Sequence, residues 1–341
     1  MQMTARARFG RAAATSVLLG AALIGGAPSA VSGASCLATG ALDRDGTPLT
    51  ARIVNPTKPV TGRVDATGCE VGVYVSRGTG LVVGADVFGA RYYGVLADGN
   101  GHNVAVDVRG SRLHDLGETP MTSSRHGQGV AYRGFAGGTA TGTVSGSRIW
   151  NYQEAGLNAT GPGSTATFVG NVITGRDATD VISQNGIQVI HGAHGVVRAN
   201  VISNLRFLGP NVGNGVLVVG GPGYGFPYTR GTRIELNHVT NADIGINIFE
   251  IEEDGSPSPL PTNILVAHNV VRNDALTNFL GWSDTQGFQA GISDYANHDR
   301  IIGNVVSGAG YDPDTCGDAA ICAPIFTLDS IDPIVSGNIL R

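Results

Sequence analysis

Short runs of alternating apolar and polar residues recur along the chain, and two residue types mark where they begin. One series of runs opens with glycine, at Gly94, Gly129, Gly156, Gly186, Gly215, Gly245 and Gly291. The other opens with asparagine followed by β-branched or other apolar residues, at Asn171, Asn200, Asn237, Asn269, Asn304 and Asn338. From Gly156 to Asn304 the two series alternate without exception. A period of two over runs this short predicts many short β-strands and no long helix.

The regular spacing of these runs indicates a structural repeat. Successive glycine positions lie 27 to 46 residues apart, and successive asparagine positions 29 to 37 apart. A single repeat of two or three strands cannot bury its apolar face, whereas stacked repeats can pair every strand in parallel with its equivalents. Asparagine is expected at a bend, because it tolerates left-handed backbone and its amide can stack; glycine is expected at the other tight corner. We therefore predict an all-β solenoid of about 8–10 coils, and the constant phase disfavours the rival β-sandwich.

The clearest repeat, QNGIQVIHGAHGVVRANVIS from Gln184 to Ser203, resembles the right-handed parallel β-helix repeats of the pectin-lyase-like superfamily. The resemblance covers about residues 70–341. It implies a right-handed parallel β-helix. It does not select a function, because the superfamily contains lyases, hydrolases, epimerases, phage tailspikes and proteins of no assigned activity.

Composition narrows the classes of protein. The chain has 52 glycines and 15 prolines among 341 residues, which argues against long helices, while 42% hydrophobic residues argue against disorder. A formal net charge of −5 without a basic cluster in the mature part argues against nucleic-acid binding.

The N-terminus is typical of an export signal. Arg6, Arg8 and Arg11 precede an apolar stretch from Ala12 to Ala27, and small residues place cleavage after Ala34. This predicts a signal peptide over 1–34, an N-terminal cap over 35–68, a β-helix over 69–341, and secretion without a membrane span. Lipid anchoring at Cys36 is the less favoured alternative. The even number of cysteines favours the disulfides Cys36–Cys69 and Cys316–Cys322, which are neighbours in the sequence.

Long excursions between the repeats locate a possible binding surface. They span 219–231, 249–262, 272–290 and 306–322, leaving the coils from two different turns, and we expect them to wall a groove across one sheet. Tyr224 and Trp282 lie in these excursions and could stack on sugar rings, or could simply pack the loops onto the coils.

Candidate catalytic residues follow from the same resemblance. In polygalacturonase-like members the catalytic carboxylates precede the Gly-Ile strand, and the matching positions here include His126, Glu154, Asn185, Asn214, Asp243 and Gln289. Glu154 and Asp243 are three coils apart, about 14 Å, beyond the ~6.5–9.5 Å of an inverting carboxylate pair. Asp294 is a further outward-facing candidate, Asn185, Asn214 and Gln289 are candidates for substrate binding, and the alternative for the Asn and Asp positions is a turn role.

A lyase mechanism would need a different base. Lys58 is the only lysine, so an arginine is the expected base, with Arg133, Arg198, Arg230 and Arg233 as candidates. The Trp-x-Asp-His and Arg-x-Pro-x-x-Arg signatures of pectate lyases are absent from the sequence, as is the adjacent Asp pair of polygalacturonases.

One acidic loop has calcium-like spacing. Asp312, Asp314 and Asp318 occupy positions 1, 3 and 7 of a calcium loop, although no Glu stands at position 12. Calcium is therefore the candidate cofactor, against the alternative of an acidic loop closed by Cys316–Cys322. The sequence predicts a carbohydrate-active enzyme, a lyase or hydrolase on an acidic polysaccharide; the alternative is a non-catalytic glycan-binding or cell-envelope protein.

Overall fold

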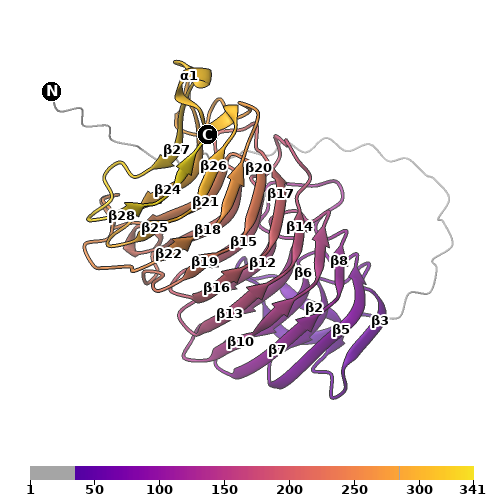
Figure 1. Ribbon diagram of the computed structural model, residues 1–341. Coiled ribbons are helices and arrows are strands. Elements are labelled where there is room, and N and C mark those ends of the chain that lie inside the picture. The colour runs from indigo at the N-terminus through magenta and orange to yellow at the C-terminus, as the bar shows by residue number, and fades with distance from the viewer. Residues whose placement is uncertain (1–34, 284) are drawn as a thin grey trace, which may run out of the picture. The chain divides into compact units, whose positions relative to one another are not determined.

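The computed structural model describes residues 35–283 and 285–341, which are almost entirely β-structure. The predicted signal peptide, 1–34, lies outside the described residues. Two large sheets contain nearly all strands, and apart from the β1–β2 pair the strands within them run parallel (Figure 1). The helices are single turns: η1 (Pro222–Tyr224), η2 (Ala309–Tyr311) and α1 (Pro313–Cys316). The all-β, parallel prediction is confirmed.

The first sheet has 11 strands and begins with an antiparallel hairpin of β1 and β2. Its strands in spatial order are β1 (Leu37–Leu42), β2 (Pro48–Val54), β4 (Val71–Val75), β6 (Tyr93–Asp98), β9 (Gln128–Arg133), β12 (Ala155–Thr160), β15 (Asn185–Ile190), β18 (Asn214–Gly220), β21 (Ile244–Glu250), β24 (Gly287–Tyr295) and β27 (Ala320–Phe326).

The second sheet has 18 strands in two parallel columns, which meet at the long strand β5. The first column contains β3 (Val60–Asp65), β5 (Gly78–Phe88), β7 (Asn103–Arg109), β10 (Thr139–Ser145), β13 (Ser164–Val169), β16 (His194–Arg198), β19 (Arg233–Glu235), β22 (Leu265–Ala267), β25 (Arg300–Ile302) and β28 (Ile334–Ser336). The second contains β8 (Arg112–His114), β11 (Arg148–Trp150), β14 (Val172–Thr174), β17 (Val201–Leu205), β20 (His238–Ala242), β23 (Val270–Arg272), β26 (Val305–Ser307) and β29 (Ile339–Leu340).

The chain visits these columns in a fixed order, which is compatible with a β-solenoid. From β6 to β26 it passes repeatedly from the first sheet to the first column of the second sheet and then to the second column. Residues in register therefore stack. One buried row, fully inaccessible from β6 to β24, consists of Val95, Val130, Leu157, Ile187, Val216, Ile246 and Ile292. These rows form one continuous core.

The asparagine series forms a ladder inside the stack. From Asn200 to Asn338, each Asn Oδ1 accepts hydrogen bonds of 2.8–3.0 Å from the backbone N–H and the Nδ2 of the Asn one coil earlier, the first of which is Asn171. Stacking is thus confirmed, but the ladder asparagines are not themselves left-handed. The left-handed residues are those immediately before them, with φ between 54° and 64°: Gly170, Ala199, Leu236, His268, Gly303 and Gly337.

The recurring glycines also have a different role from the one predicted. Gly129, Gly156, Gly186, Gly215 and Gly245 have no left-handed φ. A Cβ on any of them would lie 2.2–2.7 Å from the carbonyl oxygen of the glycine one coil later. Glycine is required there because neighbouring coils approach too closely for any side chain.

Two disulfides fasten the ends of the described chain. Cys36 is joined to Cys69 and Cys316 to Cys322, the pairs favoured from sequence. Such bonds are typical of extracellular proteins. Among the described residues, no helix is long and apolar enough to cross a membrane.

Long connections leave the stack at two turns. Residues 221–232 and 251–264 link the first sheet to the second, whereas 273–286 and 308–319 return from the second sheet to the first. These match the predicted excursions. A further long connection, 115–127, joins β8 to β9 and so also returns from the second sheet to the first. It was not among the predicted excursions.

Candidate functional site

The outer face of the first sheet carries a row of polar side chains. On the face opposite the core, Asn158 of β12 is in register with Gln188 of β15, and Asn247 of β21 follows two coils after Gln188, beyond Leu217 of β18. Asn158 Oδ1 and Gln188 Oε1 are buried and have no hydrogen-bond partner. Hydroxyl groups of an extended ligand would satisfy such acceptors.

Glu154 lies at the N-terminal end of this row, immediately before β12. Gln128 Nε2 donates a hydrogen bond of 2.7 Å to Glu154 Oε2, and Asn158 Nδ2 donates one of 2.9 Å to Gln128 Oε1. Burial raises the pKa of Glu154 to about 7, although the hydrogen bond from Gln128 and the charges of Arg125 and Arg44 act to lower it. A carboxyl group with this pKa can both give and take a proton near neutral pH.

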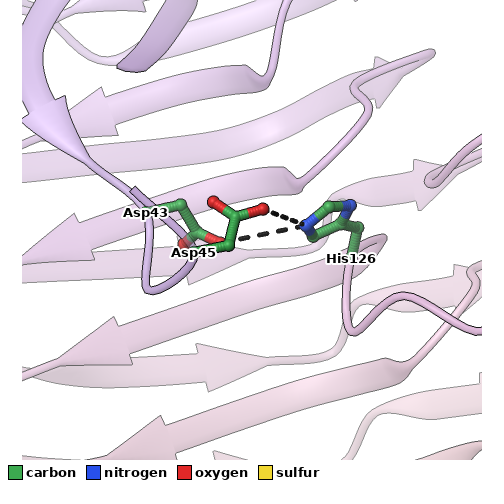
Figure 2. Close-up of side chains that lie close together, drawn as sticks. All are labelled: Asp43, Asp45 and His126. Carbon is green, nitrogen blue, oxygen red and sulfur yellow. Dashed lines mark ion pairs between the residues drawn. The ribbon is translucent and has the colours of Figure 1, made fainter. Parts of the chain in front are cut away.

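Next to Glu154, the turn between β1 and β2 brings two aspartates close to the 115–127 connection. His126 Nε2 lies 3.3 Å from Asp45 Oδ2 and 4.0 Å from Asp43 Oδ2 (Figure 2). Asp43 is buried, and its Oδ1 accepts a 2.7 Å hydrogen bond from the Tyr93 hydroxyl of β6. The charge of Asp43 adds to the rise in the pKa of Glu154.

The imidazole of His126 has a stacking partner on one face and an acidic neighbour at each nitrogen. Its ring stacks on Tyr92 with 3.6 Å between centroids, and its Nδ1 lies 3.1 Å from Glu118 Oε1. Ser124 and Thr122 donate hydrogen bonds to Glu118 Oε2. Burial acts to raise the pKa of Glu118, but these hydrogen bonds and His126 outweigh it and lower the pKa to about 2.

Arg133, at the C-terminal end of β9, belongs to a buried ion pair beside this cluster. Its Nη2 lies 2.8 Å from Asp98 Oδ2 and its Nη1 3.4 Å from Asp43 Oδ1. Burial acts to lower the pKa of Arg133, but the hydrogen bonds and charge of Asp98 raise it. Its guanidinium therefore stays charged, which suits a structural or charge-stabilising role better than that of a base.

The structure brings together three of the predicted catalytic residues, His126, Arg133 and Glu154. Asn185 and Asn214 continue the same face: Asn214 Nδ2 donates a 2.7 Å hydrogen bond to Asn185 Oδ1. Asn247 Nδ2 in turn donates one of 3.0 Å to Asn214 Oδ1. These two predicted binding residues thus form a second amide ladder next to the Asn158 row.

Asp243 and Gln289 lie elsewhere and are occupied by loop backbone. Asp243 Oδ2 accepts the N–H groups of Phe207 and Gly213, and burial raises its pKa to about 7. Gln289 Oε1 accepts the N–H of Thr277, and its Nε2 donates to the carbonyl of Gly310. Both side chains are fully buried and anchor connections to the stack.

Asp294 lies on the core side of β24, in register with the buried Ile248. Both of its carboxyl oxygens and Oδ2 of the neighbouring Asp299 are buried, and the two carboxyl groups interact with each other. Burial, together with the charge of Asp299, raises the pKa of Asp294 to about 8. It is not brought together with Glu154 on the outer face.

The two predicted aromatic platforms are about half exposed. Tyr224 contacts Phe249 edge-on, and Trp282 packs beside Phe288 with 5.4 Å between ring centroids. Another aromatic stack was not predicted. His114 lies between Phe88 at 5.3 Å and Trp150 at 4.4 Å, along the outside of the second sheet.

The predicted calcium-loop residues do not converge. Asp312 caps α1, accepting the Asp314 N–H at 3.0 Å, and Asp318 follows the helix. Among the described residues, the group of three ligand-type side chains whose ligand atoms all lie within 4.8 Å of one another is Asp43, Asp45 and His126.

Sequence reasoning missed Asp43, Asp45 and Glu118, as well as the exposed Arg44 and Arg125. The earlier hairpin and the 115–127 connection lie outside the glycine and asparagine series, so the repeat gives no indication of them. A signal was present: Asp43-Arg44-Asp45-Gly46 is typical of a tight polar turn between two strands.

Two surface hollows are lined by residues outside this cluster. One of about 400 Å³ is lined by Trp150, Asn151, Thr174, Gly175 and Arg176. No protein-family model matches the chain, and no curated protein matches it either.

Proposed function

We propose that the protein is an exported right-handed parallel β-helix of the pectin-lyase-like type that cleaves an acidic polysaccharide, with Glu154 as its proton-transfer residue. The observation that carries the proposal is the position of Glu154. Its carboxyl group has a pKa of about 7 and borders the row of amide side chains on the outer face of the first sheet. Proton transfer to or from a glycosidic linkage requires a group of this kind.

An acidic substrate is favoured by the charges around Glu154. Arg44 and Arg125 are exposed on the two connections that approach it, and both act electrostatically on its carboxyl group. Guanidinium groups bind carboxylates through paired hydrogen bonds. An extended uronate chain lying along Asn158 and Gln188 would present hydroxyl groups to their free oxygens and carboxylates to the arginines. The two disulfides support an extracellular place of action.

The test is a panel of polyuronates and neutral glycans incubated with the purified protein. Reducing ends report hydrolysis, and unsaturated products report elimination. Once a substrate has been found, the variant Glu154→Gln is assayed on it. This variant keeps the shape of the side chain and the hydrogen bond to Gln128, but it removes the carboxyl group's ionisable proton. We expect activity to fall by at least ~100-fold, the usual contribution of general acid–base catalysis.

Asp243→Asn is the matched control, because Asp243 is also buried with a pKa of about 7 but lies off this face. The Asp243→Asn variant should remain active as long as it folds. Retained activity in Glu154→Gln, or no turnover on any polyuronate, would overturn the proposal.

The aromatic stack favours a second function, glycan binding without catalysis. Trp150 stacks on His114, which stacks on Phe88, and Trp150 lines a surface hollow together with Arg176. The apolar C–H face of a uronate ring would pack on the indole of Trp150, with its carboxylate toward Arg176. Retention of the protein on an immobilised polyuronate without turnover, abolished by Trp150→Ala, would favour this function.

A further inference from the structure

The geometry points to a divalent transition-metal site formed by Asp43, Asp45 and His126. Their ligand atoms lie within 4.8 Å of one another, and His126 Nε2 is 3.3 Å from Asp45 Oδ2. Two ligands bound to the same ion at ~2.1 Å lie about 3.0–3.4 Å apart, so a small movement of Asp43 completes the set. The site does not depend on the proposed reaction.

Asp43 supplies the second, independent observation. Its side chain is 1% exposed, and its Oδ1 is used by Tyr93 and Arg133. Its Oδ2 is buried with no hydrogen-bond partner and lies 4.0 Å from His126 Nε2. A buried carboxylate oxygen without a donor is costly unless something else satisfies it, and a cation placed between Asp43 and His126 does so.

The surroundings of His126 are those of a metal-bound histidine. Metal-ligating histidines usually donate their second N–H to a carboxylate, which fixes the ring and makes it a stronger ligand. Here Nδ1 faces Glu118 Oε1 at 3.1 Å, and Tyr92 holds the ring by stacking. Glu118 is itself held by Ser124 and Thr122. This leaves Nε2 directed at the two aspartates (Figure 2).

The ligand set indicates the class of ion. One imidazole with two carboxylates suits Zn²⁺ or Mn²⁺, whereas Ca²⁺ and Mg²⁺ prefer sets made only of oxygen. The Asp45 side chain is 43% exposed, so one side of the site faces solvent. A three-ligand site with an open side can hold water or a ligand oxygen in its remaining position.

Metal binding is tested directly on the full chain, without an activity assay. The metal-stripped protein is titrated calorimetrically with Zn²⁺, Mn²⁺ and Ca²⁺ near pH 7, and thermal unfolding is followed with and without each ion. We expect one equivalent of Zn²⁺ or Mn²⁺ to bind and to raise the melting temperature, and Ca²⁺ to bind more weakly.

Variants assign the ion to these residues. Asp45→Asn changes an exposed ligand and leaves the fold intact, so it should weaken binding by at least ~10-fold. Glu118→Gln removes the carboxylate behind His126 and should weaken binding by about 10–100-fold, the usual effect of an outer-sphere partner. Asp312→Asn, on the acidic loop, is the control and should leave binding unchanged.

Two results would overturn the inference. One is the absence of stoichiometric binding of Zn²⁺ and Mn²⁺, which would leave His126 with only a structural role beside the carboxylates. The other is equal binding by wild type and Asp45→Asn. Failure of Glu154→Gln to alter activity would bear on the proposed reaction alone.

Discussion

Replacing one asparagine of the ladder should destabilise the protein far more than its size suggests. Asn237 is 1% exposed and makes four side-chain hydrogen bonds. Its Oδ1 accepts from the N–H of Asn200 at 3.0 Å and from Nδ2 of Asn200 at 2.9 Å. Its Nδ2 donates at 2.9 Å to the Val197 carbonyl and at 2.9 Å to Asn269 Oδ1.

The loss of stability can be worked out from the hydrogen-bonding groups that Asn237→Ala leaves without a partner. Two donors of Asn200 and the carbonyl of Val197 lose their partners, whereas Asn269 Oδ1 keeps the backbone N–H of Asn237 at 2.9 Å. Each buried group without a partner costs ~1–3 kcal/mol. A water molecule in the space vacated by the amide recovers part of this, so we expect a loss of about 3–5 kcal/mol in the free energy of unfolding.

The chain itself offers two matched comparisons. Ser147 and Ser111 occupy equivalent positions in earlier coils, and Ser111 N–H donates to Ser147 Oγ at 3.1 Å. Asn237→Ser should therefore lose roughly half as much stability as Asn237→Ala. Asn338, at the half-buried end of the ladder, is accessible to water, and Asn338→Ala should cost only about 1 kcal/mol.

Equilibrium unfolding in urea, followed by circular dichroism, measures all three variants. The predicted order of destabilisation is Asn237→Ala, then Asn237→Ser, then Asn338→Ala. If Asn237→Ala lies within 1 kcal/mol of wild type, or Asn237→Ser is the less stable of the two, the hydrogen-bond reasoning is wrong.

Two other predictions concern strain and pH. Leu236 has a left-handed φ of 59°, which is strained for a side-chain-bearing residue, and it is 49% exposed. Leu236→Gly should therefore raise the free energy of unfolding in urea by about 1 kcal/mol. A lower urea midpoint for this variant would contradict the strain argument. Burial raises the pKa of Asp294 to about 8 and that of Glu250 to about 9, well above their values in the unfolded chain. Unfolding therefore releases protons in this range, so the melting temperature should fall as the pH rises from 6.5 to 8.5. The fall should be less steep in Asp294→Asn. A melting temperature that rises over this pH range would refute the prediction.

Most of the fold could be predicted because it depends on local, repeated requirements. Each coil needs an amide at one corner and no side chain where neighbouring coils touch. Asparagines such as Asn200 and glycines such as Gly186 therefore recur at regular intervals in the sequence. The physical reasons were harder to infer. Left-handed backbone falls on Ala199 rather than on Asn200, and a ladder of backbone contacts, not a turn, requires glycine at Gly186.

The candidate site could be predicted only in part, because it combines a repeat with parts outside it. Glu154 was identified from its place before a strand, which the repeat defines. Asp43 belongs to a hairpin more than a hundred residues earlier in the sequence, and nothing in its local pattern shows that the hairpin folds against β6 and His126. Asp294 shows the opposite problem. Its alternation relative to Gly291 does not reveal that its side chain faces the core.

The asparagine ladder also makes the two ends of the stack chemically different. Every amide points the same way, with its N–H₂ directed toward the next coil and its oxygen toward the previous one. At one end Asn171 Oδ1 is closed by the backbone N–H of Ser147. At the other, Asn338 Nδ2 donates to the Ile301 carbonyl, and among the described residues its second hydrogen meets no further amide. The two ends of the ladder therefore offer different hydrogen-bonding groups. Another asparagine-bearing strand can continue the ladder only beyond β29.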